Sequence, residues 1–225
     1  MDNLSYIAYI CIVVSLGLLV PLLDRKMLRV VVFIIIGASS CLIVSELNSI
    51  LLRLYDDDLY YVTTTITPIT EEIIKAVPIL YYAIVFSDDP KQITACSFAV
   101  GVGFAMLENI IILIQDIDSV TIMWAVIRGF GSGLVHGICT MMIGMGISFV
   151  KKRRKLFVSG VFSLLSYAII FHATYNLLVQ SEYRYFGIAM PLLNYIPFLI
   201  VNRKDVSKFF DKFRAQTAEK EEVSE

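Results

Sequence analysis

The chain has 225 residues, of which 57% are hydrophobic and 17% are charged, and its mean hydropathy is +0.75. This composition excludes an ordinary soluble domain and indicates an integral membrane protein. The net charge is −1, and no basic patch with interleaved aromatic residues exists, so a nucleic-acid-binding protein is also excluded. All four cysteines lie in apolar segments, where they are expected to be small core residues and not a disulfide framework.

Seven apolar runs are long enough to cross a bilayer as helices. In chain order they cover residues 4–23, 28–52, 60–86, 93–114, 121–150, 156–179 and 185–201. Only Asp2 is charged before the first run, so no basic segment marks a cleaved signal peptide and this run is expected to remain as a membrane helix. The sequence therefore predicts an all-α, polytopic transmembrane bundle over residues 1–201, without a second domain.

Lysine and arginine residues are concentrated in alternate connections between these runs. They follow the first, third, fifth and seventh runs, whereas the other connections contain only Arg53 and Arg184. By the positive-inside rule, the N-terminus is expected outside and the C-terminus in the cytoplasm of a multi-pass protein of the plasma membrane. The polar tail at 202–225 is expected to form an amphipathic helix on the inner membrane surface or a fraying, disordered end, and both interpretations remain open.

Polar side chains inside these runs are the main functional signal, because an ionisable group in a membrane span usually faces a bundle interior or a water-filled cavity. They are Glu71, Glu72, Lys75, Glu108, Asn109, Arg128, His136, His172 and Asn176. At about 1.5 Å per residue, the glutamates and histidines on four successive runs reach a similar level, between the midplane and the outer face. The sequence therefore predicts a polar chamber there.

Each polar residue also has a purely structural interpretation. Lys75 is spaced to form a buried ion pair with Glu71 or Glu72. Glu108 could extend to the outer surface, and Arg128 is expected at the membrane interface. His136 could be a packed histidine in a row of glycines, Gly129, Gly133 and Gly137, that lets another helix approach closely. His172 could form an interhelical hydrogen-bond pair with Asn176.

Backbone breakers lie beside the polar residues. Pro68 and Pro78 flank the two glutamates and are expected to bend their helix, and the glycines of GVGF at 101–104 are expected to loosen the helix before Glu108. Irregular backbone at membrane depth is tolerated where it lines a wet cavity. The pattern therefore supports a water-accessible site.

Two classes of function suit this constellation. The first is hydrolysis in the membrane. In one version a carboxylate is the general base, and histidine or asparagine side chains donate to the oxyanion. In the other version the same groups hold zinc, although no HEXXH motif is present. The second is a proton- or ion-coupled transporter that uses the same Glu and His cluster. A retinal photoreceptor is set aside because the run at 185–201 has no lysine.

Four motifs in this order resemble the PrsW family of intramembrane proteases, which is related to the CAAX prenyl endopeptidases and bacteriocin-processing membrane enzymes. The motifs are EEIIK (71–75), GFAMLEN (103–109), HGICT (136–140) and HATYN (172–176), and the likeness covers about residues 65–180. It implies a membrane protease that cleaves a membrane-anchored or membrane-proximal protein substrate near the outer face, in regulated proteolysis of the kind that removes an anti-sigma factor.

The resemblance also implies site residues. Glu71 and Glu72 would activate water or organise the site, His172 and Asn176 would donate to the oxyanion, and His136 matches the third motif. Glu108 stands where the prenyl endopeptidases have a histidine, so either a second carboxylate handles the proton of the base, or the site is more acidic and better suited to a cation. The cofactor is therefore either absent or a divalent metal such as zinc; the candidate metal ligands are Glu72, Glu108, His136 and His172.

Overall fold

The computed structural model describes residues 3–115, 117–118, 120–151 and 153–201, and every regular element in these ranges is helical. The predicted tail helix at 202–225 lies outside the described residues. The long helices are α1 (Asn3–Gly17), α2 (Arg25–Leu54), α4 (Thr67–Val85), α5 (Pro90–Gln115), α6 (Ile122–Val150) and α7 (Phe157–Val179). The short ones are η1 (Val20–Leu22), α3 (Leu59–Tyr61), η2 (Val62–Ile66), η3 (Arg154–Leu156), α8 (Arg184–Ala189) and α9 (Leu192–Val201).

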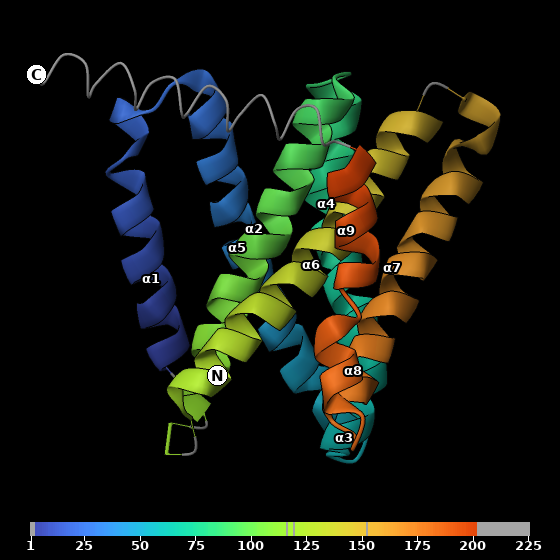
Figure 1. Ribbon diagram of the computed structural model, residues 1–225. Helices are drawn as coiled ribbons and strands as arrows, with labels where there is room; N and C mark the ends of the chain where they lie inside the picture. Colours follow the sequence, from blue (N-terminus) through green and yellow to red (C-terminus); the bar gives the residue numbers. More distant parts are fainter. Residues whose placement is uncertain (1–2, 116, 119, 152, 202–225) are drawn as a thin grey trace, which may run out of the picture.

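Helix α5 lies at the centre of the bundle, where it packs most extensively against α6 and α2. Figure 1 shows α1 and α7 at opposite sides of the molecule, with α6 crossing obliquely between them. The apolar core is formed by side chains of α2, α4, α5, α6 and α7, and a second cluster joins α2 and α5 to α1. Most other apolar side chains are exposed, as expected for a surface that faces lipid.

Within the described part of the chain, five helical segments are long and apolar enough to span a membrane: Leu4–Leu22, Arg25–Leu54, Pro90–Gln115, Ile122–Val150 and Phe157–Val179. The all-helical class is therefore confirmed, whereas the predicted count of seven spans and the predicted orientation of the termini remain predictions. The run at 60–86 contains a charged turn, and the run at 185–201 is not one continuous helix. It breaks between α8 and α9 at Pro191, which lacks the N–H that would continue a helix.

The chain enters α4 through a widened turn. Residues Val62–Ile66 form a π-helical turn, and the N–H of Thr67 donates to the carbonyl of Val62. Pro68 follows at once, and its ring would clash with the carbonyl four residues before it in a regular α-helix, so a wider turn relieves the contact. This irregular backbone lies one helical turn before the two glutamates, in agreement with the expectation from Pro68.

The expectation that GVGF loosens its helix was wrong. Helix α5 is continuous through Gly101 and Gly103, and both glycines serve close helix contacts. A Cβ on Gly101 would collide with the main chain of His136 on α6, and one on Gly103 would collide with the main chain of Ile34 on α2. Small residues allow such close approach between membrane helices. Gly101 thereby fixes the position of α6 at the histidine.

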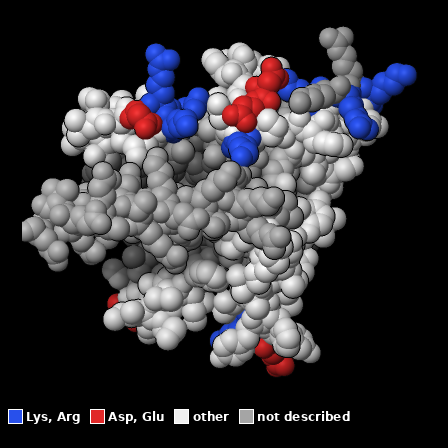
Figure 2. Space-filling view, turned by 45° about the horizontal axis from the view of Figure 1, so that its top comes forward, with Lys and Arg blue, Asp and Glu red and all other residues white. Residues whose placement is uncertain are grey.

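Basic residues gather at one end of the bundle, where α2 and α5 begin and α6 ends. Figure 2 shows Lys and Arg side chains concentrated at the top of the visible face. The described residues at that end are Arg25, Lys26, Arg29, Lys91, Lys151, Arg153 and Lys155. The opposite end carries Asp56, Asp57 and Asp58 in the connection after α2. The two ends of the bundle therefore differ in lysine and arginine content in the same way as the alternate connections in the sequence.

Candidate active site

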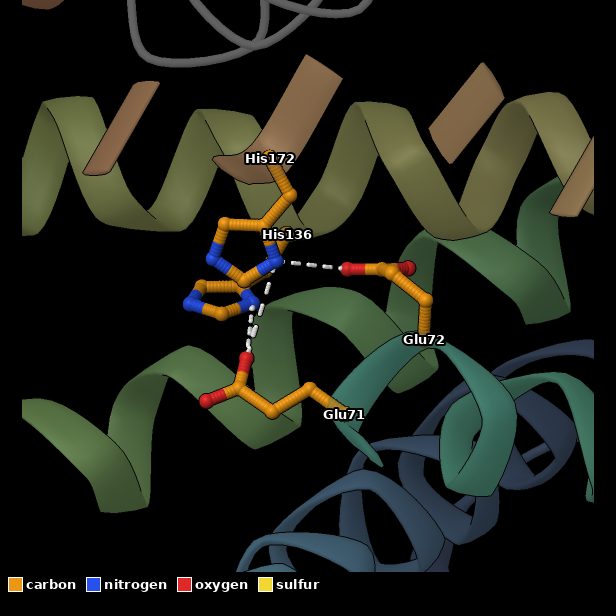
Figure 3. Close-up of side chains that lie close together, drawn as sticks. All are labelled: Glu71, Glu72, His136 and His172. Atoms are coloured by element: carbon orange, nitrogen blue, oxygen red, sulfur yellow. Dashed lines mark hydrogen bonds and ion pairs between the residues drawn. The ribbon is translucent and has the colours of Figure 1, made fainter. Parts of the chain in front are cut away.

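Three helices bring two glutamates and two histidines to one point in the core. Glu71 and Glu72 come from α4, His136 from α6 and His172 from α7, and Figure 3 shows the four side chains converging. One donor atom from each residue lies within 4.8 Å of the others. None of the four residues is more than 3% exposed. We call these four residues the Glu–His cluster.

The contacts within the Glu–His cluster are of two kinds. His172 Nδ1 lies 2.9 Å from Glu72 Oε1, which is a hydrogen bond. Glu71 Oε2 is 3.6 Å from His136 Nδ1 and 3.7 Å from His172 Nδ1, which is too long for one. Among the described residues, neither Glu71 Oε2 nor Glu72 Oε2 has a hydrogen-bond partner, although both atoms are buried. Such an atom in a native core indicates a missing ligand or a catalytic role.

Lys75 lies one helical turn after the glutamates and is fully buried. Its Nζ is 2.7 Å from Glu72 Oε1, 2.8 Å from His136 Nδ1 and 3.9 Å from Glu71 Oε2. The aromatic face of Phe104 lies 4.7 Å from the same ammonium. The ion pair that the spacing allowed is therefore formed, mainly with Glu72. It does not draw the glutamates away from the histidines, because the lysine lies among them.

Glu108, predicted as a catalytic residue and a metal ligand, contacts the far side of His136. Its Oε2 lies 3.2 Å from His136 Nε2, 3.0 Å from Ser132 Oγ and 3.3 Å from an Arg128 guanidinium nitrogen. Because the carboxylate accepts, Nε2 carries the ring proton and Nδ1 is left as the acceptor for Lys75. Glu108 lies outside the Glu–His cluster and orients one of its histidines.

Arg128 and Ser132 are neighbours of Glu108. The side chain of Arg128 is 26% exposed and forms an ion pair with Glu108, and its expected place at the membrane interface stays a prediction. Ser132 was not singled out, and it is buried against the same carboxylate. The signal was present in the spacing, because positions 128, 132 and 136 lie one above the other on a helix.

Asn176, predicted as an oxyanion donor, makes a different contact in this structure. Its side-chain nitrogen donates to the carbonyl of Thr63, at 3.1 Å, within the π-helical turn. The amide therefore ties α7 to the backbone that leads into α4. The oxyanion role stays a prediction, and the structure adds a supporting role for the same side chain.

The row of glycines on α6 is only partly used. A Cβ on Gly137 would collide with the ring of Phe98 on α5, so this glycine serves helix packing as expected. At Gly129 and Gly133, an added Cβ would meet no described atom within 4 Å. His136 is held by Gly101, Glu108 and Lys75 instead of by a row of glycines along its own helix.

The donor set of the Glu–His cluster suits a divalent metal. Two imidazole nitrogens and two carboxylates are ligands that zinc prefers, and catalytic zinc sites commonly use two histidines and one glutamate. Zinc bonds of about 2.1 Å in a tetrahedral arrangement separate the ligand atoms by about 3.4 Å. The ligand atoms of the cluster lie within 4.8 Å of one another, which is of the same order as this separation. Glu71 Oε2 and Glu72 Oε2 have no hydrogen-bond partner among the described residues, so one of them can face an ion and the other a water molecule.

Comparison with known proteins assigns a family. The sequence model described as "PrsW family intramembrane metalloprotease" matches residues 25–202, which include the Glu–His cluster, Lys75, Glu108 and Asn176. Searches among curated proteins and among solved structures gave no significant match. The match covers most of the chain, and it includes the buried donor set that a hydrolytic metal site requires. The chain therefore belongs to the PrsW family of intramembrane metalloproteases.

Proposed function

We propose that this protein hydrolyses a peptide bond of a membrane-anchored or membrane-proximal protein, near the outer face of the plasma membrane, with the Glu–His cluster as its active site. The observation that carries the proposal is the convergence of four buried donor residues with an unpartnered carboxylate oxygen, Glu71 Oε2, facing both histidines. The family match supports a peptidase, and the level of the cluster predicted from the sequence supports the outer side.

The four residues have different roles in this proposal. Glu72, His136 and His172 would hold a divalent cation such as zinc, in the two-histidine, one-carboxylate set of catalytic sites. When bound, the cation supplies a Lewis acid for the scissile carbonyl and for a water molecule. Oε2 of both glutamates has no hydrogen-bond partner among the described residues. Glu72 differs from Glu71 because its other oxygen, Oε1, is held by Lys75 and His172.

Glu71 is accordingly the general base. Its Oε2 takes a proton from the attacking water, and the same carboxyl group then returns the proton to the leaving amine nitrogen. Glu108 keeps the proton of His136 on Nε2, so that Nδ1 faces the cluster. The surrounding helices exclude bulk water, which strengthens each of these interactions. The family of this protein, and the predicted level of the Glu–His cluster near the outer face of the membrane, suit regulated proteolysis of an anti-sigma-factor-like membrane protein.

The test is a comparison of new N-termini in cells that produce the wild-type protein or Glu71→Gln at equal membrane levels. Quantitative labelling of protein N-termini should reveal cleavage products of membrane proteins that depend on the wild-type chain and disappear in the variant. Loss of the base should slow hydrolysis by about a hundredfold or more. His136→Ala should abolish the same products.

Glu46→Gln is the matched control, because Glu46 is a carboxylate within a membrane helix that accepts a hydrogen bond from Tyr6 away from the Glu–His cluster. It should leave the cleavage products unchanged. The proposal fails if Glu71→Gln and His136→Ala are folded and inserted and still yield the full set of products.

A further inference from the structure

The ammonium of Lys75 lies beside the atoms that would hold a metal ion. Three residues of the Glu–His cluster face its ammonium, and two of them, Glu72 and His136, lie at hydrogen-bond distance from Nζ. The lysine is fully buried in the bundle. A cation is therefore already in place among the candidate ligands, and it is supplied by the chain itself.

The lone pair of His136 Nδ1 can interact with the Lys75 ammonium or with a metal ion, but not with both at once. A neutral imidazole has one acceptor nitrogen, and here Nε2 carries the proton that Glu108 accepts. The single acceptor lone pair on Nδ1 is directed at Lys75 Nζ, 2.8 Å away. The same lone pair cannot accept from an ammonium and bind a metal at once.

Electrostatics adds to this stereochemical conflict. Two cations a few ångströms apart in a buried site repel each other strongly, since a protein interior screens charge much less than water does. The Glu72 carboxylate also serves both cations, because its Oε1 accepts from Lys75 at 2.7 Å and the residue is a candidate metal ligand. Without a metal, the lysine compensates the buried charge of Glu72, which would otherwise be costly.

We propose that Lys75 is an internal competitor for the metal, an inference that rests on the proposed metal-dependent function. Its ammonium stabilises the metal-free bundle and must leave Glu72 and His136 when a divalent ion binds. The long, flexible lysine side chain can make this movement, and the ring of Phe104 at 4.7 Å offers a face on which the ammonium can stay. Lys75 is thus a positioning residue that sets the metal affinity of the site.

The first test is a zinc titration of purified protein against a chelating indicator. Lys75→Met removes the charge and keeps most of the side-chain volume, and we expect it to bind zinc roughly tenfold more tightly or better. Lys75→Arg keeps the charge and should bind no more tightly than the wild type. Lys151→Met is the matched control: Lys151 is ion-paired with Asp88 and lies about 22 Å further along α6 than His136, so zinc affinity should not change.

The outcomes separate this inference from the function on which it rests. If the wild type binds zinc and Lys75→Met binds it equally or less tightly, Lys75 is not a competitor for the metal, but the proposal that the Glu–His cluster binds metal is retained. If zinc binds neither the wild type nor the variant, both fail. If zinc binds Lys75→Met alone, or binds it more tightly, the competition is supported.

A second measurement covers the case in which Lys75→Met does not fold without metal. Structures of the wild-type protein with and without zinc should differ at Lys75. With zinc bound, Nζ should lie beyond about 3.5 Å from His136 Nδ1, outside hydrogen-bond range. A zinc-bound cluster in which Nζ keeps its present contacts with Glu72 and His136 would overturn the inference.

Discussion

Both ring nitrogens of His136 have defined partners, and this determines how the site can work. Glu108 accepts from Nε2, and Lys75 donates to Nδ1. The carboxylate of Glu108 is in turn held by Ser132 and Arg128, which lie on the same face of α6 as the histidine. A chain of contacts therefore extends from the half-buried Arg128 to the centre of the Glu–His cluster. The orientation of the imidazole depends on groups that touch neither substrate nor metal.

Glu108→Ala tests this orienting role. Without the carboxylate, Nε2 loses its acceptor and the proton can move to Nδ1, so zinc affinity and proteolysis should each fall by about 10- to 100-fold. Ser132→Ala removes one of several contacts and should have a smaller effect in the same direction. The measurements are zinc affinity and the rate of appearance of cleavage products. Unchanged zinc affinity in folded Glu108→Ala would contradict the role.

At the scale of single elements, the π-helical turn and the close contacts of α5 position the reacting groups. The turn places Glu71 and Glu72 at the start of α4, and Asn176 on α7 binds its backbone. Gly101 lets the main chains of α5 and α6 meet at His136. Neither feature contributes a group to the chemistry, yet both determine where those groups lie.

Asn176→Leu separates structural support from an oxyanion role. Loss of the hydrogen bond to Thr63 should lower the free energy of unfolding by about 1 kcal/mol and slow proteolysis by less than about tenfold. Removal of an oxyanion donor would instead slow the reaction by about 100- to 1000-fold and leave stability unchanged. Thermal unfolding in detergent and the cleavage rate together distinguish the two results, and the second result would contradict the supporting role.

Gly101→Ala should destabilise the bundle because its Cβ would collide with the main chain of His136. Overpacking of this kind costs about 1–3 kcal/mol. Gly129→Ala is the matched control, since an added Cβ there meets no described atom within 4 Å. Replacing glycine in a helix interior by alanine should stabilise this position by about 0.5–1 kcal/mol. If the melting temperatures of Gly101→Ala and Gly129→Ala change in the same direction and by the same amount, the helix contact at Gly101 is contradicted.

At the scale of the whole molecule, the uneven distribution of lysine and arginine predicts how the bundle lies in the membrane. The end with the cluster of lysines and arginines is expected in the cytoplasm, and the end with Asp56–Asp58 outside. Glu71 and Glu72 near the start of α4, and His172 near the end of α7, would then lie toward the side of the proposed substrate bond. Orientation and function are therefore linked in this account.

Labelling of single cysteines tests the orientation. In a background without the four native cysteines, a cysteine at Asp57 should react with a membrane-impermeant maleimide in intact cells, and one at Asp89 should react only after lysis. Both positions are exposed in loops between helices. The opposite pattern would place the loop after α2 in the cytoplasm and contradict the proposed side of cleavage.

Sequence reasoning predicted the helical class and the residues that converge, because both depend on composition and on polar groups at matching depth. Of the six residues that it placed at one site, Glu71, Glu72, His136 and His172 converge, whereas Glu108 contacts the far side of His136 and Asn176 contacts Thr63. It could not predict that Lys75 lies between the glutamates and His136, because spacing on one helix gives no contact with another helix. The break at Pro191 and the π-helical turn also depend on how the chain packs, although a proline signalled each.

Metal analysis of the purified protein is the decisive experiment for a metal-dependent active site. We expect about one zinc or similar divalent ion per active chain. We expect Glu71→Gln to keep the metal but lose proteolysis, and His172→Ala to lose both, because Glu71 is the base and His172 a ligand. Active wild-type protein without stoichiometric metal, or Glu71→Gln with full activity, would rule out this mechanism.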